Sequence, residues 1–343
     1  MKKLSVLFCA SALLAACGGG GGGDDSSTAS TGTVSFSLTD APVDDAKHVV
    51  VTVDKVILRR NGASDVVIDT FTIPPLNLAN ADTFQIDLLD YRNGNGLLFI
   101  NGLVVPAGTY SQLILQVIDG DSTHSYVHEM DDEIKQIKQP SGDLKLGGFT
   151  VQQGGVYSYM LDFDLRKAMT YNPGNNGNGQ DRYILKPTGV RLLDLQLAAS
   201  LSGRVDDDLF SDTACASKVD PTVGNAVYLY QGVDLAPLNL ADVYDPALAV
   251  GVPAGAISPY AAANVYPDTV NGGYVYSLGY VPAGNYTLAF SCDAMDDDPE
   301  QYDGIETPVV TIPLPADQLT ELTLTAGQAA ICNLPVSGGI CAP

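Results

Sequence analysis

Short runs of alternating apolar and polar residues, separated by Gly, Pro, Asn and Asp, recur from residue 33 onward and constrain the fold more than any other feature. Clear examples are residues 34–38, 49–53 and 113–117. A period of two places apolar side chains on one face of a strand, as in the half-buried strands of a sandwich. The pattern favours a single helix, a short one near residues 162–170. The sequence therefore predicts an all-β protein of sandwich-type domains.

The length of 343 residues corresponds to two domains of ordinary size. We place the first domain at residues 33–199 and the second at residues 200–343, because a new strand pattern opens just after residue 200. The low-complexity stretch 172–180 is interpreted as a loop of the first domain, since strand-like sequence follows it. The formal net charges of the two domains are -7 and -16. We therefore expect tandem β-sandwiches, of which the second is strongly anionic.

The N-terminus has the pattern of a signal peptide, with a basic start and an apolar stretch within residues 1–16. That stretch is shorter than the roughly 20 residues that a spanning helix needs. Its end, Leu14-Ala15-Ala16-Cys17, resembles the lipobox of bacterial lipoproteins, which implies that Cys17 carries a lipid. Residues 17–32 then form a flexible Gly/Ser tether. Gly18 after the cysteine implies an outer-membrane anchor facing the periplasm or the cell surface; an ordinary signal peptide with an incidental cysteine is the alternative.

The overall charge excludes some classes of partner. A formal charge of -23 repels phosphate backbones and anionic lipid head groups. Nucleic acid is therefore not expected as a partner, and contact with a membrane is expected only through the lipid anchor. The sequence contains no Gly-x-Ser-x-Gly elbow, no His-Glu-x-x-His pair and no phosphate-binding loop. We therefore predict a protein that is not an enzyme.

Four cysteines follow Cys17, all in the second domain: Cys215, Cys292, Cys332 and Cys341. In an exported chain they favour two disulfides, and the absence of a Cys-x-x-Cys pair argues against zinc. Three connectivities are open. We favour Cys215 with Cys292, and Cys332 with Cys341, which closes a short C-terminal loop.

Two acidic loops of the second domain are candidates for calcium, which takes six to eight oxygen ligands. Residues 293–303 hold five Asp and one Glu, and residues 206–212 hold a second cluster. The favoured disulfide between Cys215 and Cys292 would bring the loops together. The alternative is that both loops are simply hydrated, because neither has the spacing of an EF-hand. The candidate calcium ligands are Asp206, Asp208, Asp212, Asp296, Asp297, Asp298, Glu300 and Asp303.

Aromatic and histidine side chains allow two interpretations. Tyr228 and Tyr230, and then Tyr274 and Tyr276, alternate in strand register. An exposed row of such rings would stack on sugars, whereas rings between sheets would only fill the core. The histidines, at positions 48, 124 and 128, are interpreted as surface or turn residues, and residues 119–131 are interpreted as a hairpin loop.

The repeated sequence Val-Pro-Ala-Gly-x-Tyr, at residues 105–110 and 281–286, predicts a tight turn that leads into a strand. Together with other segments in order, the first copy makes residues 33–195 resemble the DUF4382 family of bacterial lipoproteins, which implies no catalytic residues. The segments that carry this resemblance are residues 37–42, 51–56, 105–110, 147–151, 161–167 and 185–187. The second domain resembles the prealbumin-like, or carboxypeptidase-regulatory-like, β-sandwich through residues 201–205, 226–230 and 281–290. That resemblance implies a spacer or, as in some relatives, a starch- or glycan-binding module.

These features predict an outer-membrane lipoprotein that acts as a non-catalytic binding module. Carbohydrate is the specific ligand class that we expect, with calcium as an accessory. The alternative is a structural spacer, or an adhesion subunit that contacts another envelope protein.

Overall fold

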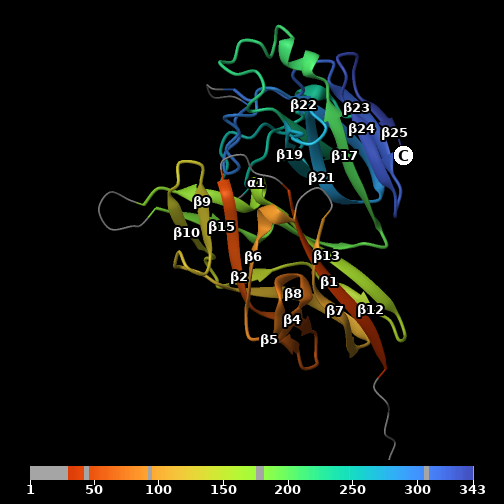
Figure 1. Ribbon diagram of the computed structural model, residues 1–343. Coiled ribbons are helices and arrows are strands. Elements are labelled where there is room, and N and C mark those ends of the chain that lie inside the picture. The colour runs from red at the N-terminus through yellow and green to blue at the C-terminus, as the bar shows by residue number, and fades with distance from the viewer. Residues whose placement is uncertain are drawn as a thin grey trace, which may run out of the picture.

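The alternating pattern folds into strands throughout the computed structural model, which describes residues 30–41, 46–91, 95–174, 181–246, 248–304 and 309–342. The chain is an all-β protein, as predicted. The first domain forms the red-to-yellow half and the second the green-to-blue half in Figure 1. The expected signal peptide, Cys17 and the tether up to residue 29 lie outside the described residues. Within the described part of the chain, no helix is long and apolar enough to cross a membrane.

The first domain contains two main sheets and a small hairpin. One sheet has the order β16 (Val190–Asp194), β13 (Val156–Asp164), β1 (Thr31–Ala41), β7 (Leu97–Pro106). The other has the order β11 (Asp143–Lys145), β8 (Gly108–Ile118), β2 (Ala46–Arg60), β9 (Tyr126–Glu129), β10 (Ile134–Lys138), β15 (Arg182–Leu185), β14 (Met169–Asn172). The short strands β3 (Val66–Ile68) and β6 (Phe84–Asp87) pair with β2, β12 (Phe149–Val151) pairs with β8, and β4 (Phe71–Ile73) pairs with β5 (Leu78–Ala81).

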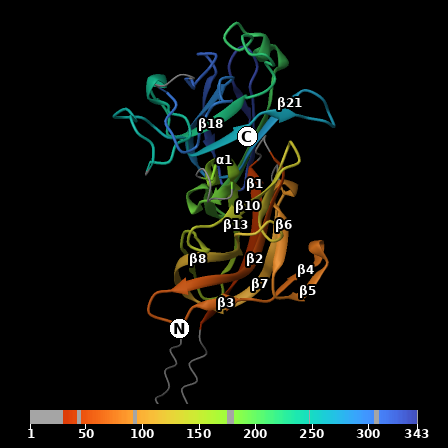
Figure 2. The ribbon, with the colours of Figure 1, turned by 90° about the vertical axis from the view of Figure 1, so that its left-hand side faces the viewer.

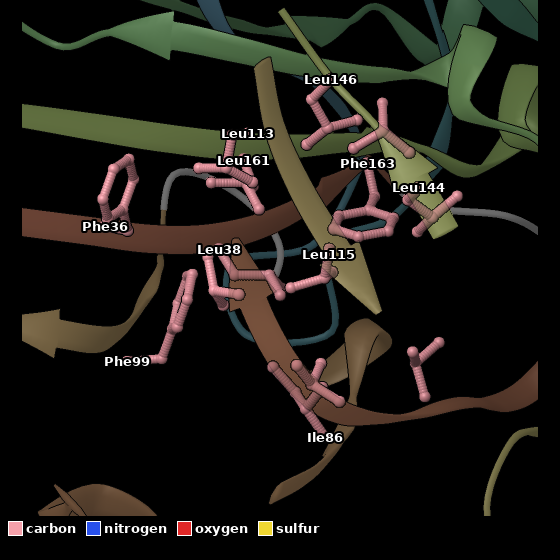
Figure 3. Close-up of a cluster of buried hydrophobic side chains, with 14 of the residues drawn as sticks. Phe36, Leu38, Ile86, Phe99, Leu113, Leu115, Leu144, Leu146, Leu161 and Phe163 are labelled. Atoms are coloured by element: carbon pink, nitrogen blue, oxygen red, sulfur yellow. The ribbon is translucent and has the colours of Figure 1, made fainter. Parts of the chain in front are cut away.

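Alternate residues of these strands form the first core, as the period of two predicts. Phe36 and Leu38 of β1 face Leu113 and Leu115 of β8, and all four are buried (Figure 3). β1 pairs in parallel with β13 and antiparallel with β7, so it is a central strand. The strand begins at Thr31, so the sheet includes the last two residues that we assigned to the tether.

Two local expectations can be compared with the structure. The predicted helix exists as α1 (Leu165–Ala168), a single turn, because β13 continues to Asp164 before it. Residues 119–131, interpreted as a hairpin loop, instead contain β9, which pairs with β2. The loop interpretation was wrong for residues 126–129, where Val127 is buried in the core. The sequence did not reveal this strand, because an alternation of four residues is too short to be recognised.

The second domain is a sandwich of two sheets. One has the order β20 (Tyr266–Pro267), β21 (Tyr274–Pro282), β17 (Ala198–Val205), β24 (Ala329–Asn333), β25 (Ile340–Ala342). The other has the order β19 (Ala261–Asn264), β18 (Ala226–Gln231), β22 (Gly284–Ser291), β23 (Leu319–Leu324). Figure 2 shows this domain stacked end to end on the first. Residues 195–197 connect β16 of the first set of sheets to β17 of the second.

Both favoured disulfides are present. Cys215 and Cys292 are bonded with their Cα atoms 5.5 Å apart, and this bond ties the segment after the 3-10 helix η4 (Asp207–Ser211) to the end of β22. Cys332 and Cys341 link β24 to β25.

The repeated Val-Pro-Ala-Gly-x-Tyr sequence forms an equivalent tight turn in each domain, which passes the chain from a strand of one sheet to a strand of the other. It joins β7 to β8 and β21 to β22, as the turn residues predict. In each copy the tyrosine hydroxyl donates a hydrogen bond to the proline carbonyl four residues earlier. The donor–acceptor distances are 2.7 Å for Tyr110 and 2.9 Å for Tyr286. The buried tyrosine therefore stabilises the turn that precedes it. The sequence pattern did not predict this hydrogen bond.

Candidate functional site

α1 lies at the junction between the two domains (Figure 1), and its Arg166 and Lys167 side chains donate hydrogen bonds to the second domain. Leu165 and Ala168 are buried in the first domain, so the intervening Arg166 and Lys167 point away from its core. Close packing beneath the helical turn requires Gly189, because a Cβ atom there would lie 2.2 Å from the Ala168 nitrogen. The local sequence thus fixes the direction of two cations.

Arg166 makes more polar contacts across this junction than any other described residue. Its guanidinium donates to Asn264 Oδ1, to the Ala294 carbonyl at 2.9 Å and to Asp297 Oδ2 at 2.8 Å. The Arg166 side chain is 12% exposed and the Asp297 side chain is fully buried. This is a buried, charge-assisted contact, which is more costly to break than a surface ion pair.

Two further cations of the first domain also contact acceptors of the second domain. Lys186 Nζ lies 3.2 Å from Asp245 Oδ2 and 2.6 Å from Glu300 Oε1. Arg191 is paired with Asp162 of its own domain and also donates to the Tyr260 carbonyl at 3.2 Å. The second domain contains only two cations itself, Arg204 and Lys218. The anionic domain therefore takes its buried positive partners from the first domain, and the charge difference that the sequence shows becomes complementarity at the junction.

Buried carboxylates accompany these cations. Asp162 and Asp164, on successive outward positions of β13, are almost completely buried. Burial raises the pKa of Asp164, and Arg191, Lys167 and Arg166 counteract this only in part. The folded chain therefore retains a proton on Asp164 at pH values where the unfolded chain has released it.

This proton predicts a pH dependence for the Asp164→Asn variant. Between about pH 4 and the raised pKa, wild-type stability falls as the pH rises, by at most about 1.4 kcal/mol per pH unit for one group. Asparagine removes that loss, so the free energy of unfolding of the variant should rise relative to wild type between pH 4.5 and pH 7.5. Urea unfolding at both pH values measures this change, with Asp54→Asn, at a half-exposed acid, as the control. An equal difference at the two pH values would contradict the assignment.

A cleft of about 470 Å³ opens beside Arg166. This volume lies in the range of small-ligand sites. Apolar and polar side chains of both domains line it. They are Ala46, Val49, Val127, Leu165, Arg166, Met169, Thr170, Tyr171 and Tyr183 of the first domain, and Val223, Gly224, Asn264, Ala294, Met295, Asp297, Asp298, Pro299 and Glu300 of the second.

Two tyrosines form the aromatic part of this cleft. The ring centroids of Tyr171 on β14 and Tyr183 on β15 lie 5.3 Å apart, and Tyr171 remains 42% exposed. The Tyr171 hydroxyl donates to Asp181 at 2.9 Å, and the Tyr183 hydroxyl donates to Glu129 at 2.7 Å. The pair is therefore held in place by carboxylates while the outer ring faces solvent.

The acidic loop of the second domain supplies a compact carboxylate cluster behind the cleft wall. One carboxylate oxygen from each of Asp242, Asp297 and Asp303 lies within 4.8 Å of the other two. The Oδ1 atoms of Asp242 and Asp297 are buried and have no hydrogen-bond partner among the described residues. Burial, assisted by the charges of the two neighbours, raises the pKa of Asp242 to about 7. We refer to these three residues as the carboxylate cluster.

The remaining oxygens of the carboxylate cluster are anchored. Asp242 Oδ2 accepts a hydrogen bond from the backbone nitrogen of Asp303. Asp297 Oδ2 accepts from the Tyr228 hydroxyl at 2.6 Å and from Arg166. Each of these two carboxylates thus has one oxygen held by protein donors and one left over.

The predicted calcium ligands are distributed over separate places. Asp297 and Asp303 belong to the carboxylate cluster, and Glu300 is paired with Lys186. Asp296 and Asp298 are exposed in the same loop. Asp206, Asp208 and Asp212 lie in and around η4, and no cation-sized carboxylate group among the described residues includes them. Sequence reasoning missed Asp242, whose signal is a single acid between the buried apolar residues Leu240 and Val243.

The predicted tyrosine row is mostly buried. Tyr228, Tyr230 and Tyr276 are almost fully buried, so they do not form an exposed platform for sugars. The partly exposed rings that line the cleft beside the acidic loop are Tyr171 and Tyr183 of the first domain. His48 of β2 and His128 of β9 stack with ring centroids 5.5 Å apart, and His124 lies in a turn.

The fold and the junction define a two-domain all-β protein with a charged, ligand-sized cleft between its domains. Residues 31–187 match the model of the family described as a domain of unknown function, DUF4382, so the resemblance of the first domain to that family is confirmed. A comparison with curated proteins finds no match.

Solved structures align with low scores. A leucine-rich repeat protein from Bacteroides thetaiotaomicron aligns at 12% identity and a TM-score of 0.20, over 90% of this chain and 26% of its own. A candidate cell adhesion protein from Bacteroides fragilis aligns at 9% identity and a TM-score of 0.20, over 90% and 95%. The fimbrial anchor protein of Porphyromonas gingivalis aligns at 10% identity and a TM-score of 0.19, over the same shares. Scores this low do not establish a common fold.

Proposed function

We propose that this protein is a non-catalytic binding module of the cell envelope, anchored in the outer membrane through a lipid on Cys17, and that its ligand occupies the interdomain cleft. The observation that carries the proposal is a cleft of about 470 Å³ that both domains line and that contains a partly exposed aromatic pair beside carboxylates. The signal-like sequence of residues 1–17 supports the location.

Carbohydrate is the ligand class that this lining fits best. Sugar rings present C–H faces to aromatic rings and hydroxyl groups to carboxylates and amides. Tyr171 and Tyr183 supply the first kind of surface, and Asp298, Glu300 and Asn264 supply the second. Calcium is retained as an accessory in this proposal, because the acidic loop forms one wall of the cleft.

A glycan array probed with the purified chain tests this proposal. We expect saturable binding of one class of glycan by the wild type, and a loss of about tenfold in affinity for Tyr171→Ala, since one aromatic contact contributes about 1.4 kcal/mol. Tyr266→Ala is the matched control. It alters a second hollow, of about 890 Å³, on the outer face of the β20–β21–β17–β24 sheet. Loss of binding in Tyr266→Ala, with Tyr171→Ala unaffected, would contradict the interdomain cleft as the site.

One observation favours the structural alternative, a spacer or adhesion subunit that contacts another envelope protein. Tyr228, Tyr230 and Tyr276 pack inside the second domain, as expected if its aromatic residues serve stability alone. An array without any saturable signal would support this alternative.

A further inference from the structure

We propose that Asp242, Asp297 and Asp303 bind one calcium ion at the junction side of the second domain. This inference takes up the calcium component of the proposed function and adds a ligand, Asp242, from a distant segment of the chain. It does not depend on the glycan component, because the cluster is complete without any residue of the aromatic pair.

Two buried carboxylate oxygens of the cluster lack a hydrogen-bond donor among the described residues. A buried carboxylate oxygen without a hydrogen-bond donor is costly unless another positive group satisfies it. Asp242 Oδ1 and Asp297 Oδ1 are both in this situation, and both belong to carboxylates of the cluster. Since protein donors hold the Oδ2 atoms, the side chains are fixed with their second oxygens free for a ligand.

The net charge of the cluster also matches a divalent cation. Three carboxylates carry three negative charges when ionised, and Arg166 brings one positive charge within 2.8 Å of Asp297. The remainder is two negative charges, which a divalent cation neutralises. Such a cation also removes the mutual repulsion of the three carboxylates.

The type of the three ligand atoms and the distances between them also fit calcium. All three ligands are hard carboxylate oxygens, which calcium and magnesium prefer over zinc. Oxygens that share one calcium ion at about 2.4 Å lie no more than about 4.8 Å apart. The three oxygens of the cluster satisfy this limit. Calcium accepts irregular shells that water completes, whereas magnesium demands near-octahedral geometry.

A second acidic group provides a contrast. Glu129, Asp131 and Glu133 also come within 4.8 Å of one another, but two of the three are exposed. Lys135 Nζ lies 3.2 Å from Glu129 and 3.1 Å from Glu133, so a protein cation already compensates part of their negative charge. This group needs no metal.

Calcium titration of the purified full chain by calorimetry, with thermal unfolding in parallel, tests the assignment. We expect one equivalent of calcium to bind and to raise the melting temperature, and magnesium to bind more weakly. Asp242→Asn should weaken calcium binding at least tenfold, while the amide still accepts the hydrogen bond from Asp303. Asp296→Asn, an exposed acid of the same loop and itself a sequence-predicted ligand, is the control and should bind as the wild type does.

Each outcome of this experiment either supports or overturns the calcium site. If Asp242→Asn fails to fold, as judged by circular dichroism, Asp303→Asn is read in its place with the same expectation. Absence of calcium-dependent heat and of a melting shift in the wild type would overturn the site. Equal weakening by Asp296→Asn and Asp242→Asn would also overturn it, because binding would then reside on the exposed loop. The experiment uses the metal alone, so either failure would leave glycan binding in the cleft standing.

Discussion

Replacing Arg166 by methionine is expected to lower the free energy of unfolding by about 3 to 5 kcal/mol. The methionine retains most of the apolar stem but removes the donors to Asn264, Ala294 and Asp297. Asp297 is then left as a buried carboxylate with only the Tyr228 hydroxyl as donor. The cost arises mainly from this uncompensated charge, and less from the loss of the attraction itself. Denaturant unfolding of the full chain at pH 7.5 measures it.

The control for this change is Arg59→Met on the surface of the first domain. Arg59 Nε lies 3.5 Å from Asp65 Oδ2, and the two side chains are 45% and 33% exposed. Exposed pairs of this kind contribute at most about 1 kcal/mol. Equal effects of the two substitutions would show that Arg166 does not hold the junction, and would remove the argument that the anionic domain depends on cations of its neighbour.

The second large effect is expected from the disulfide between Cys215 and Cys292. The bond closes a loop of 77 residues, and its removal restores chain entropy to the unfolded state that corresponds to about 4.5 kcal/mol. The Cys332–Cys341 bond spans nine residues, for which the same relation gives about 2.6 kcal/mol. Alanine is the suitable replacement at the first pair, because both cysteines are buried.

The comparison of the two double alanine variants, Cys215 with Cys292 and Cys332 with Cys341, is the measurement. We expect the first to lose more stability in denaturant unfolding, by about 2 kcal/mol. A larger loss for the C-terminal pair would contradict the entropic explanation, and would mean that β25 contributes more to the second domain than its three residues suggest.

The fold could largely be predicted, because strand alternation is a local signal. Val34, Phe36 and Leu38 alternate in sequence and all point into the core. β9 escaped this reasoning, since four residues between turns carry too little periodicity to recognise. One pairing of the cysteines could also be favoured among the three open connectivities, because Cys332 and Cys341 close a short C-terminal loop.

The candidate site could be predicted only in part, because it depends on contacts between distant segments. Asp297 and Asp303 belong to an acidic loop that is conspicuous in the sequence. Asp242 lies 61 residues before Asp303 and has no acidic neighbour within two positions, so no local pattern joins them. The cleft is even harder to predict from the sequence, because Tyr171 comes from one domain and Glu300 from the other. Sequence reasoning looked for aromatic residues in the acidic domain, whereas the exposed pair is supplied by the opposite domain.

The junction of the two domains is proposed to hold a ligand site supported by a cation. An anomalous difference map from crystals of the chain grown with calcium tests this most directly. We expect one peak bounded by Asp242, Asp297 and Asp303, with Arg166 in place on Asp297. A map without a peak there, or with its strongest peak at Glu129, Asp131 and Glu133, would contradict it.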